Sequence, residues 1–148
     1  MDEHLKRRLA VTAASALTIA LAGCSVQSEE RISADQARDA LHSLISDTAE
    51  QLGDGTWNEV VGPPYSSKCG SADAVKFAYS VSTERGMDPR ADAEEVAEYW
   101  LRLGMSVKIS DGPVLAVFGS GGPVSAVSFG TGPAVYSISG TSRCSTGE

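Results

Sequence analysis

The sequence predicts an α+β fold in which two helices pack on one face of an antiparallel sheet of about five to six strands. Two stretches carry apolar residues at helical spacing, and several short apolar runs lie between Gly- and Pro-rich segments. The short separations in the second half favour hairpins, and hence antiparallel pairing. A sheet with both helices on one face would bury both apolar stripes.

The first helix is expected over residues 33–52. Ser33 and Gln36 have the spacing of a capping box, and Gly53 and Gly55 follow the last apolar position. His42 lies off the apolar stripe. The stripe consists of Ala37, Ala40, Leu41, Leu44, Ile45, Thr48, Ala49 and Leu52.

Two strand candidates follow, over residues 57–61 and 74–82. Gly62-Pro63-Pro64 is expected to end the first, because proline cannot donate to a ladder, and residues 65–70 are expected to form a loop carrying Cys69. The second alternates between apolar and mostly polar residues, which is typical of a half-buried strand.

The second helix is expected over residues 88–103, where Asp88 would cap it, Pro89 would occupy its first position and Gly104 would end it. Four further strands are expected over residues 105–109, 113–118, 124–129 and 134–139. Glycine-containing segments at 119–122 and 130–132 are expected to divide the last three.

The first part of the chain has the layout of an exported leader. Lys6-Arg7-Arg8 precedes an uncharged, Ala- and Leu-rich run that ends at Leu21-Ala22-Gly23-Cys24. This ending resembles the lipobox of bacterial lipoproteins. The resemblance implies a diacylglycerol on the sulfur of Cys24, cleavage between Gly23 and Cys24, and a protein anchored by this lipid in the cell membrane with its domain on the extracytoplasmic side.

That interpretation divides the chain into a signal peptide (1–23), a polar tether (24–32) and one α+β domain (33–148). An ordinary cleaved signal or a membrane anchor are the alternatives. The uncharged window up to Glu29 approaches the ~20 residues of a spanning helix, although Thr and Ser residues dilute it.

The three cysteines fit the lipobox interpretation. If Cys24 carries lipid, Cys69 and Cys144 remain as an even pair in an oxidising compartment, and we expect them to form a disulfide. A redox role is the alternative. It has little support, because the sequence contains no Cys-x-x-Cys motif.

The formal net charge of the chain is −7, and cleavage of the leader would remove more basic than acidic residues. This charge argues against nucleic acid as a partner, since phosphate contacts need Lys and Arg. It also argues against electrostatic adhesion to anionic lipid, so attachment is expected through the lipid on Cys24 alone.

A second resemblance covers most of the domain. A Cys before a strand (Cys69), a helix ending in Trp100-Leu101-Arg102-Leu103-Gly104, a β-meander and a near-terminal Cys144 look like small actinobacterial lipoproteins of undefined function. This resemblance implies a location and a fold more than an activity.

Few residues suggest chemistry. His42, the one histidine after the leader, lacks companions for a zinc site and a Gly-x-Ser-x-Gly elbow for a triad. The glycines at 119–122 are not followed by the Lys of a phosphate-binding loop. A solvated helix face accounts for the acidic residues of the second helix better than a glycosidase pair does. These are Asp88, Asp92, Glu94, Glu95 and Glu98.

Trp57 and Tyr65 flank the Gly-Pro-Pro segment and are a candidate ligand groove. The sequence therefore favours a lipid-anchored, non-catalytic module that binds an envelope protein or a small ligand, with no metal or cofactor. A surface hydrolase and a carrier of an apolar ligand are the alternatives.

Overall fold

The computed structural model describes residues 31–53, 55–71, 73–84 and 86–146, without the side chains of residues 61–63. The expected α+β class is confirmed, and the elements follow the expected order. They are α1 (Ala34–Gln51), β1 (Asn58–Lys68), β2 (Val75–Glu84), α2 (Pro89–Arg102), β3 (Ser106–Asp111), β4 (Leu115–Gly121), β5 (Val124–Thr131) and β6 (Val135–Ser142).

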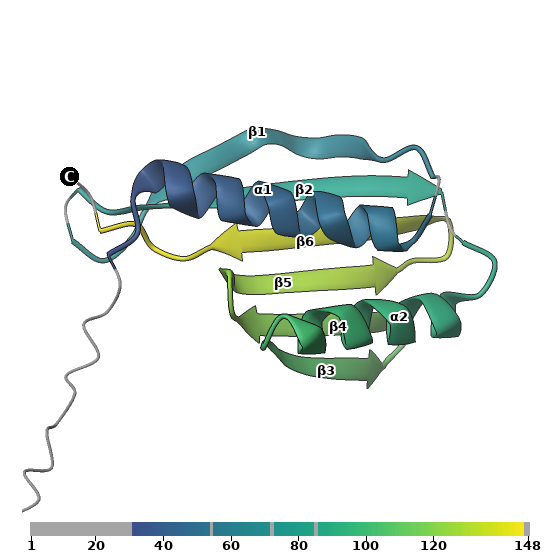
Figure 1. Cartoon of the computed structure of the whole chain (residues 1–148). Helices are drawn as coiled ribbons and strands as arrows, with labels where there is room; N and C mark the ends of the chain where they lie inside the picture. Colours follow the sequence, from purple (N-terminus) through teal and green to yellow (C-terminus); the bar gives the residue numbers. More distant parts are fainter. Residues whose placement is uncertain (1–30, 54, 72, 85, 147–148) are drawn as a thin grey trace, which may run out of the picture.

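The six strands form one antiparallel sheet in the order β1-β2-β6-β5-β4-β3. Helix α2 carries the chain from β2 to the far edge, and the meander from β3 to β6 then returns to pair β6 with β2 (Figure 1). Strands that are distant in the sequence thus meet in the middle of the sheet.

Each helix begins at the cap that its sequence predicts. The Ser33 hydroxyl accepts a hydrogen bond from the Gln36 amide, and the Gln36 side chain accepts one from the Ser33 amide, so the capping box is confirmed. The Asp88 carboxylate accepts a hydrogen bond from the Ala91 amide, and Pro89 begins α2.

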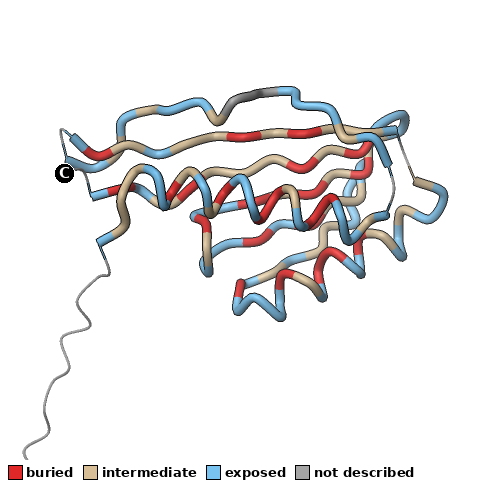
Figure 2. The backbone as a smooth tube through the Cα atoms, turned by 45° about the horizontal axis from the view of Figure 1, so that its top comes forward, coloured by how far each residue is buried: buried red, intermediate tan, exposed pale blue. Residues whose placement is uncertain are grey.

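The core lies between the helices and the sheet. Helix α1 lies along β2 and β6, whereas α2 lies along β3 and β4 (Figure 1). Figure 2 shows the buried residues gathered where the helices pack on the strands. Trp100 is wholly buried, and its indole N–H donates a 2.9 Å hydrogen bond to the hydroxyl of Thr48 on α1. This bond joins the two helices inside the core.

Two glycines set how closely the helices approach the sheet. A Cβ on Gly119 of β4 would lie 2.8 Å from Cε3 of Trp100, and one on Gly140 of β6 would lie 2.9 Å from Cδ1 of Leu41. Both distances are shorter than a carbon–carbon contact allows. At each of these two contacts the strand residue is a glycine, so the helix side chain packs directly on the strand backbone.

The predicted end of β4 before Gly119 was wrong. The glycines at 119–122 were expected to separate two strands, but β4 runs through Gly119 to Gly121, and β5 runs on to Thr131. Gly119 serves close packing inside a strand, and a glycine in a sequence does not distinguish this role from a turn.

The predicted end of β1 at its prolines was also wrong. They were expected to end the strand, and residues 65–70 were expected to form a loop, but β1 continues through Pro63 and Pro64 to Lys68. The register against β2 shifts between Glu59 and Tyr65. Because β1 is an edge strand, one side of its backbone needs no ladder partner, and bulges there accommodate the prolines.

The predicted disulfide is present between Cys69 and Cys144, whose Cα atoms are 6.0 Å apart. It lies at the end of the sheet where β1 finishes, β2 begins and β6 finishes. The amide of Thr146 donates a 2.9 Å hydrogen bond to the carbonyl of Ile32, just before α1. The start of the described chain and its C-terminal segment are therefore fastened at the same end.

Candidate functional site

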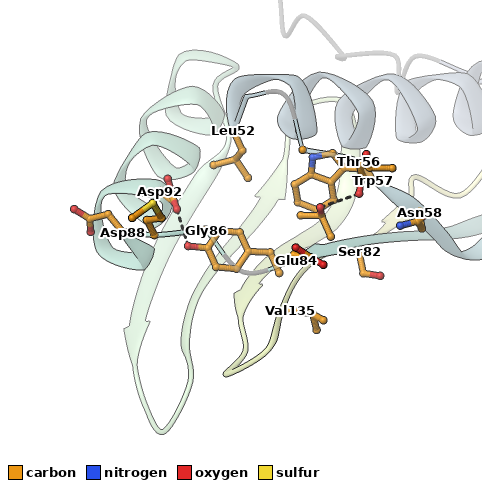
Figure 3. A pocket seen from close by; sticks show the side chains of 14 residues that line it. Leu52, Thr56, Trp57, Asn58, Ser82, Glu84, Gly86, Asp88, Asp92 and Val135 are labelled. Atoms are coloured by element: carbon orange, nitrogen blue, oxygen red, sulfur yellow. Dashed lines mark hydrogen bonds between the residues drawn. The ribbon is translucent and has the colours of Figure 1, made fainter.

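A cleft of about 800 Å³ lies at the opposite end of the sheet. It is bounded by the end of α1, the start of β1, the end of β2, the start of α2 and the start of β6 (Figure 3). The lining residues are Leu52, Gly55, Thr56, Trp57, Asn58, Ser82, Thr83, Glu84, Gly86, Met87, Asp88, Asp92, Val135 and Tyr136.

Trp57 supplies the large apolar surface on one side of this cleft (Figure 3). The indole is half-buried and packs against the edge of the core. Its segment is tied to β2 by the hydroxyl of Thr83, which donates a 2.8 Å hydrogen bond to the carbonyl of Thr56. An aromatic face held in this way is a firm surface for a ligand ring or an apolar side chain.

Asp92 lies on the other side of the cleft (Figure 3), where it meets Tyr136, another lining residue. The Tyr136 hydroxyl donates a 2.6 Å hydrogen bond to Oδ2 of Asp92, which joins β6 to α2. Gly86 passes directly over this pair, because a Cβ there would lie 2.6 Å from Asp92 Oδ2 and 2.9 Å from the Tyr136 hydroxyl. The backbone itself therefore packs on the pair, with no room for a side chain.

Among the described residues, three carboxylates line the cleft, and two of them have structural partners. Asp88 caps α2, and Asp92 accepts the bond from Tyr136. Glu84 is exposed at the end of β2. Asp54 and Arg85 adjoin lining residues in the sequence and lie outside the described residues.

The structure separates the two aromatic residues of the predicted groove. Trp57 lines the cleft, whereas Tyr65 is 66% exposed, pairs with Ala78 and is not among the lining residues. They are apart because β1 continues through the prolines to Lys68, where the strand was expected to end and a loop to follow. Gly23 and Cys24, the expected cleavage and lipidation sites, lie outside the described residues.

His42 has a neighbour that the sequence did not indicate. It is exposed on α1, and its ring stacks on that of Tyr79 with 5.1 Å between centroids. The hydroxyl of the buried Tyr79 donates a 2.9 Å hydrogen bond to Oε1 of Glu59. Burial, and secondly the bond to Glu59 and its charge, raise the pKa of Tyr79 to about 12. The phenol therefore keeps its proton and serves as a donor.

In the described ranges, no three His, Cys, Asp or Glu side chains are grouped so that they could hold a metal ion. Neither described helix is long and apolar enough to cross a bilayer.

Sequence reasoning missed Glu84, Asp92 and Tyr136 as residues of one site. Asp92 was interpreted as part of a solvated helix face, and Tyr136 as part of a meander strand. They meet because β6 pairs with β2, which brings Tyr136 beside Thr83. No local pattern in the sequence gives that pairing.

In comparisons with known proteins, no family model, curated protein or solved structure matches the chain.

Proposed function

We propose that this chain is a lipid-anchored lipoprotein of the bacterial cell envelope, and that its domain is a non-catalytic binding module. In this proposal Cys24 carries the lipid, both helices cover a single face of the sheet, and the cleft beside Trp57 holds the ligand. The ligand is a small molecule or a segment of an envelope protein.

The observation that carries the proposal is the position of the cleft relative to the proposed anchor. The tether joins the domain at Ile32, just before α1, and Leu52 at the other end of α1 lines the cleft. The 18 residues of α1 span about 27 Å at 1.5 Å per residue. A protein held by lipid on Cys24 would thus have its cleft at the end away from the attachment point.

The anchor is tested by metabolic labelling with a fatty acid in a bacterial host. The wild-type protein should incorporate label and partition into detergent. Cys24→Ala should do neither, whereas Ser25→Ala, a neighbouring control, should behave as wild type. Equal labelling of the Cys24→Ala protein would contradict the anchor.

The cleft is tested by screening soluble cell-wall fragments for amide chemical-shift changes. A binding fragment should move signals of Thr83, Gly86 and Val135, and Trp57→Ala should weaken it at least tenfold. Tyr65→Ala is the matched control, since it removes an exposed aromatic residue of β1 outside the cleft and should leave affinity unchanged. Shifts confined to another surface would reject the cleft, and turnover of a fragment would favour the hydrolase alternative.

A further inference from the structure

The segments that form the cleft beside Trp57 carry a net negative charge, even when every charged residue in them is counted. The segments that supply its lining residues are 52–58, 82–92 and 135–136. Their charged residues are four acidic ones and two basic ones, namely Asp54, Glu84, Asp88, Asp92, Arg85 and Arg90. Arg90 is ion-paired with Asp111. Arg85 lies outside the described residues, and its full charge would offset one of the four carboxylates.

Helix α2 begins at the cleft, and its N-terminus adds a partial positive charge there. A helix N-terminus is equivalent to about half an elementary charge. The Asp88 carboxylate caps this helix by accepting a hydrogen bond from the Ala91 amide, so it balances the partial charge. The carboxylates of Glu84 and Asp92 remain to set the charge of the described lining.

Each of these lining carboxylates has an oxygen that accepts no hydrogen bond from a described residue. Oδ1 of Asp88 and Oδ2 of Asp92 accept the bonds from Ala91 and Tyr136, which leaves the second oxygen of each carboxylate. The carboxylate of Glu84, exposed at the end of β2, has neither a hydrogen bond nor an ion pair with a described residue (Figure 3). These oxygens can accept hydrogen bonds from a donor that enters the cleft.

The carboxylates favour a positively charged ligand over a neutral or a negative one. A neutral ligand that covered them would remove their water without supplying a counter-charge, which costs free energy. An anion would also be repelled by them. An ammonium or guanidinium group instead replaces the lost water with charge-assisted hydrogen bonds.

Trp57 favours a cation that is carried on an apolar stem. The indole lines the same cleft as Glu84, and the two residues come from adjacent strand ends, because Asn58 of β1 pairs with Ser82 of β2 (Figure 3). The face of an indole attracts a nearby cation, and it also packs against methylene groups. The lining therefore offers surface for both parts of such a ligand.

We propose that the cleft binds an ammonium or guanidinium group on an apolar stem, as in a Lys or Arg side chain or a free alkylamine. The cation lies among the carboxylates of Glu84 and Asp92, and the stem packs against Trp57. This inference rests on the proposed binding function of the cleft and adds the chemical class of its ligand.

Titrations that follow amide chemical shifts of the mature protein with matched probes test this class. A trilysine peptide blocked at both ends should move the signals of Thr83, Gly86 and Val135. The same peptide acetylated on all three side chains keeps its length and loses its charges, and it should bind about tenfold more weakly. Raising the salt from about 0.02 M to about 0.5 M should weaken the charged peptide much more than the acetylated one.

A second probe distinguishes the two sources of the cation. 1,5-Diaminopentane carries ammonium groups on an apolar stem without a peptide backbone. Binding of this diamine at the same signals supports a free alkylamine as the ligand, and binding of the charged peptide alone supports a side chain.

Two variants separate the position of a carboxylate from its charge. Glu84→Gln should weaken the charged peptide about threefold, which is the effect of one exposed ion pair, and should leave the acetylated peptide unchanged. Glu98→Gln removes the same charge from an exposed position of α2 outside the cleft, and it should bind as the wild type does.

Three results would overturn the cationic class: no binding of the charged peptide, equal affinities for the two peptides, or equal effects of the two variants. If a neutral or anionic wall fragment then moved the signals of the cleft, the proposed binding function would stand without this inference. Shifts confined to another surface would overturn both.

Discussion

Gly119 and Gly140 lie beneath the two helices, and their missing side chains decide how closely each helix approaches the sheet. The indole of Trp100 rests on Gly119, and the side chains of Leu41 and Ile45 lie over Gly140. Large side chains on the helices thus face bare backbone on the strands. Such complementary packing gives interiors their density and makes them sensitive to one added methyl group.

The first prediction concerns Gly119→Ala. The new methyl would lie 2.8 Å from Trp100 Cε3 and 3.0 Å from Val127 Cγ1, so α2 or β5 must shift. The free energy of unfolding should fall by about 1–3 kcal/mol, as for other overpacked cores. Urea denaturation measures it. Gly112→Ala is the control, because its methyl would meet nothing closer than 3.8 Å. Equal stability of the two variants would contradict the packing described here.

The second prediction concerns the ionisation of Tyr79. The folded protein holds the phenol proton more tightly than the unfolded chain does, because the pKa is raised from 10.0 to about 12. The stability that this adds is fully present below pH 10 and is lost as the pH rises to about 12. The loss should amount to about 2 kcal/mol.

Tyr79→Phe provides the comparison, because it keeps the ring and removes the ionisable group. Its free energy of unfolding should fall less steeply than that of the wild type between pH 10 and 12. Burial also raises the pKa of Tyr99, and this contribution is present in both proteins, so their difference isolates Tyr79. Parallel pH curves would show that Tyr79 is not held as described.

At the scale of the elements, α1 and α2 are fastened to each other as well as to the sheet. The Thr48 hydroxyl donates a 2.7 Å hydrogen bond to the Leu44 carbonyl and accepts the one from Trp100, and both side chains are wholly buried. A buried indole N–H needs such an acceptor, because leaving it unpaired is destabilising.

The third prediction therefore concerns Thr48→Val, which keeps the shape and removes the acceptor. The free energy of unfolding should fall by about 1–3 kcal/mol because the Trp100 N–H is left unpaired. In a Trp100→Phe background the same substitution should be markedly less destabilising. Chemical denaturation of the four proteins gives the coupling between the two residues, and strictly additive effects would argue against the bond.

Local signals predicted the helices and strands correctly where an element's start or end depends on residues that are close in the sequence. Ser33 with Gln36 and Asp88 with Pro89 predicted both helix starts. The same signals failed where tertiary context decides. Pro63 and Pro64 are tolerated because β1 is at an edge, and Gly119 serves packing inside a strand. The order of the strands could not be predicted from the sequence, because it depends on the pairing of β6 with β2. For the same reason the residues of the cleft could not be predicted, apart from Trp57.

At the scale of the whole molecule, the fold has two different ends. One holds the disulfide and the bond between Thr146 and Ile32, and the other holds the cleft. The disulfide links positions 75 residues apart and connects the C-terminal segment to the β1–β2 connection. The segment that would transmit a pull from the tether is therefore fastened to the covalently closed end.

The fourth prediction, and the most direct test of the proposed anchor, is the mass of the N-terminal peptide of protein recovered from bacterial membranes. We expect a chain that begins at Cys24, carries a diacylglyceryl group on that sulfur, and has Cys69 and Cys144 joined. A peptide with a free Cys24 thiol, or one still preceded by residues 1–23, would contradict it.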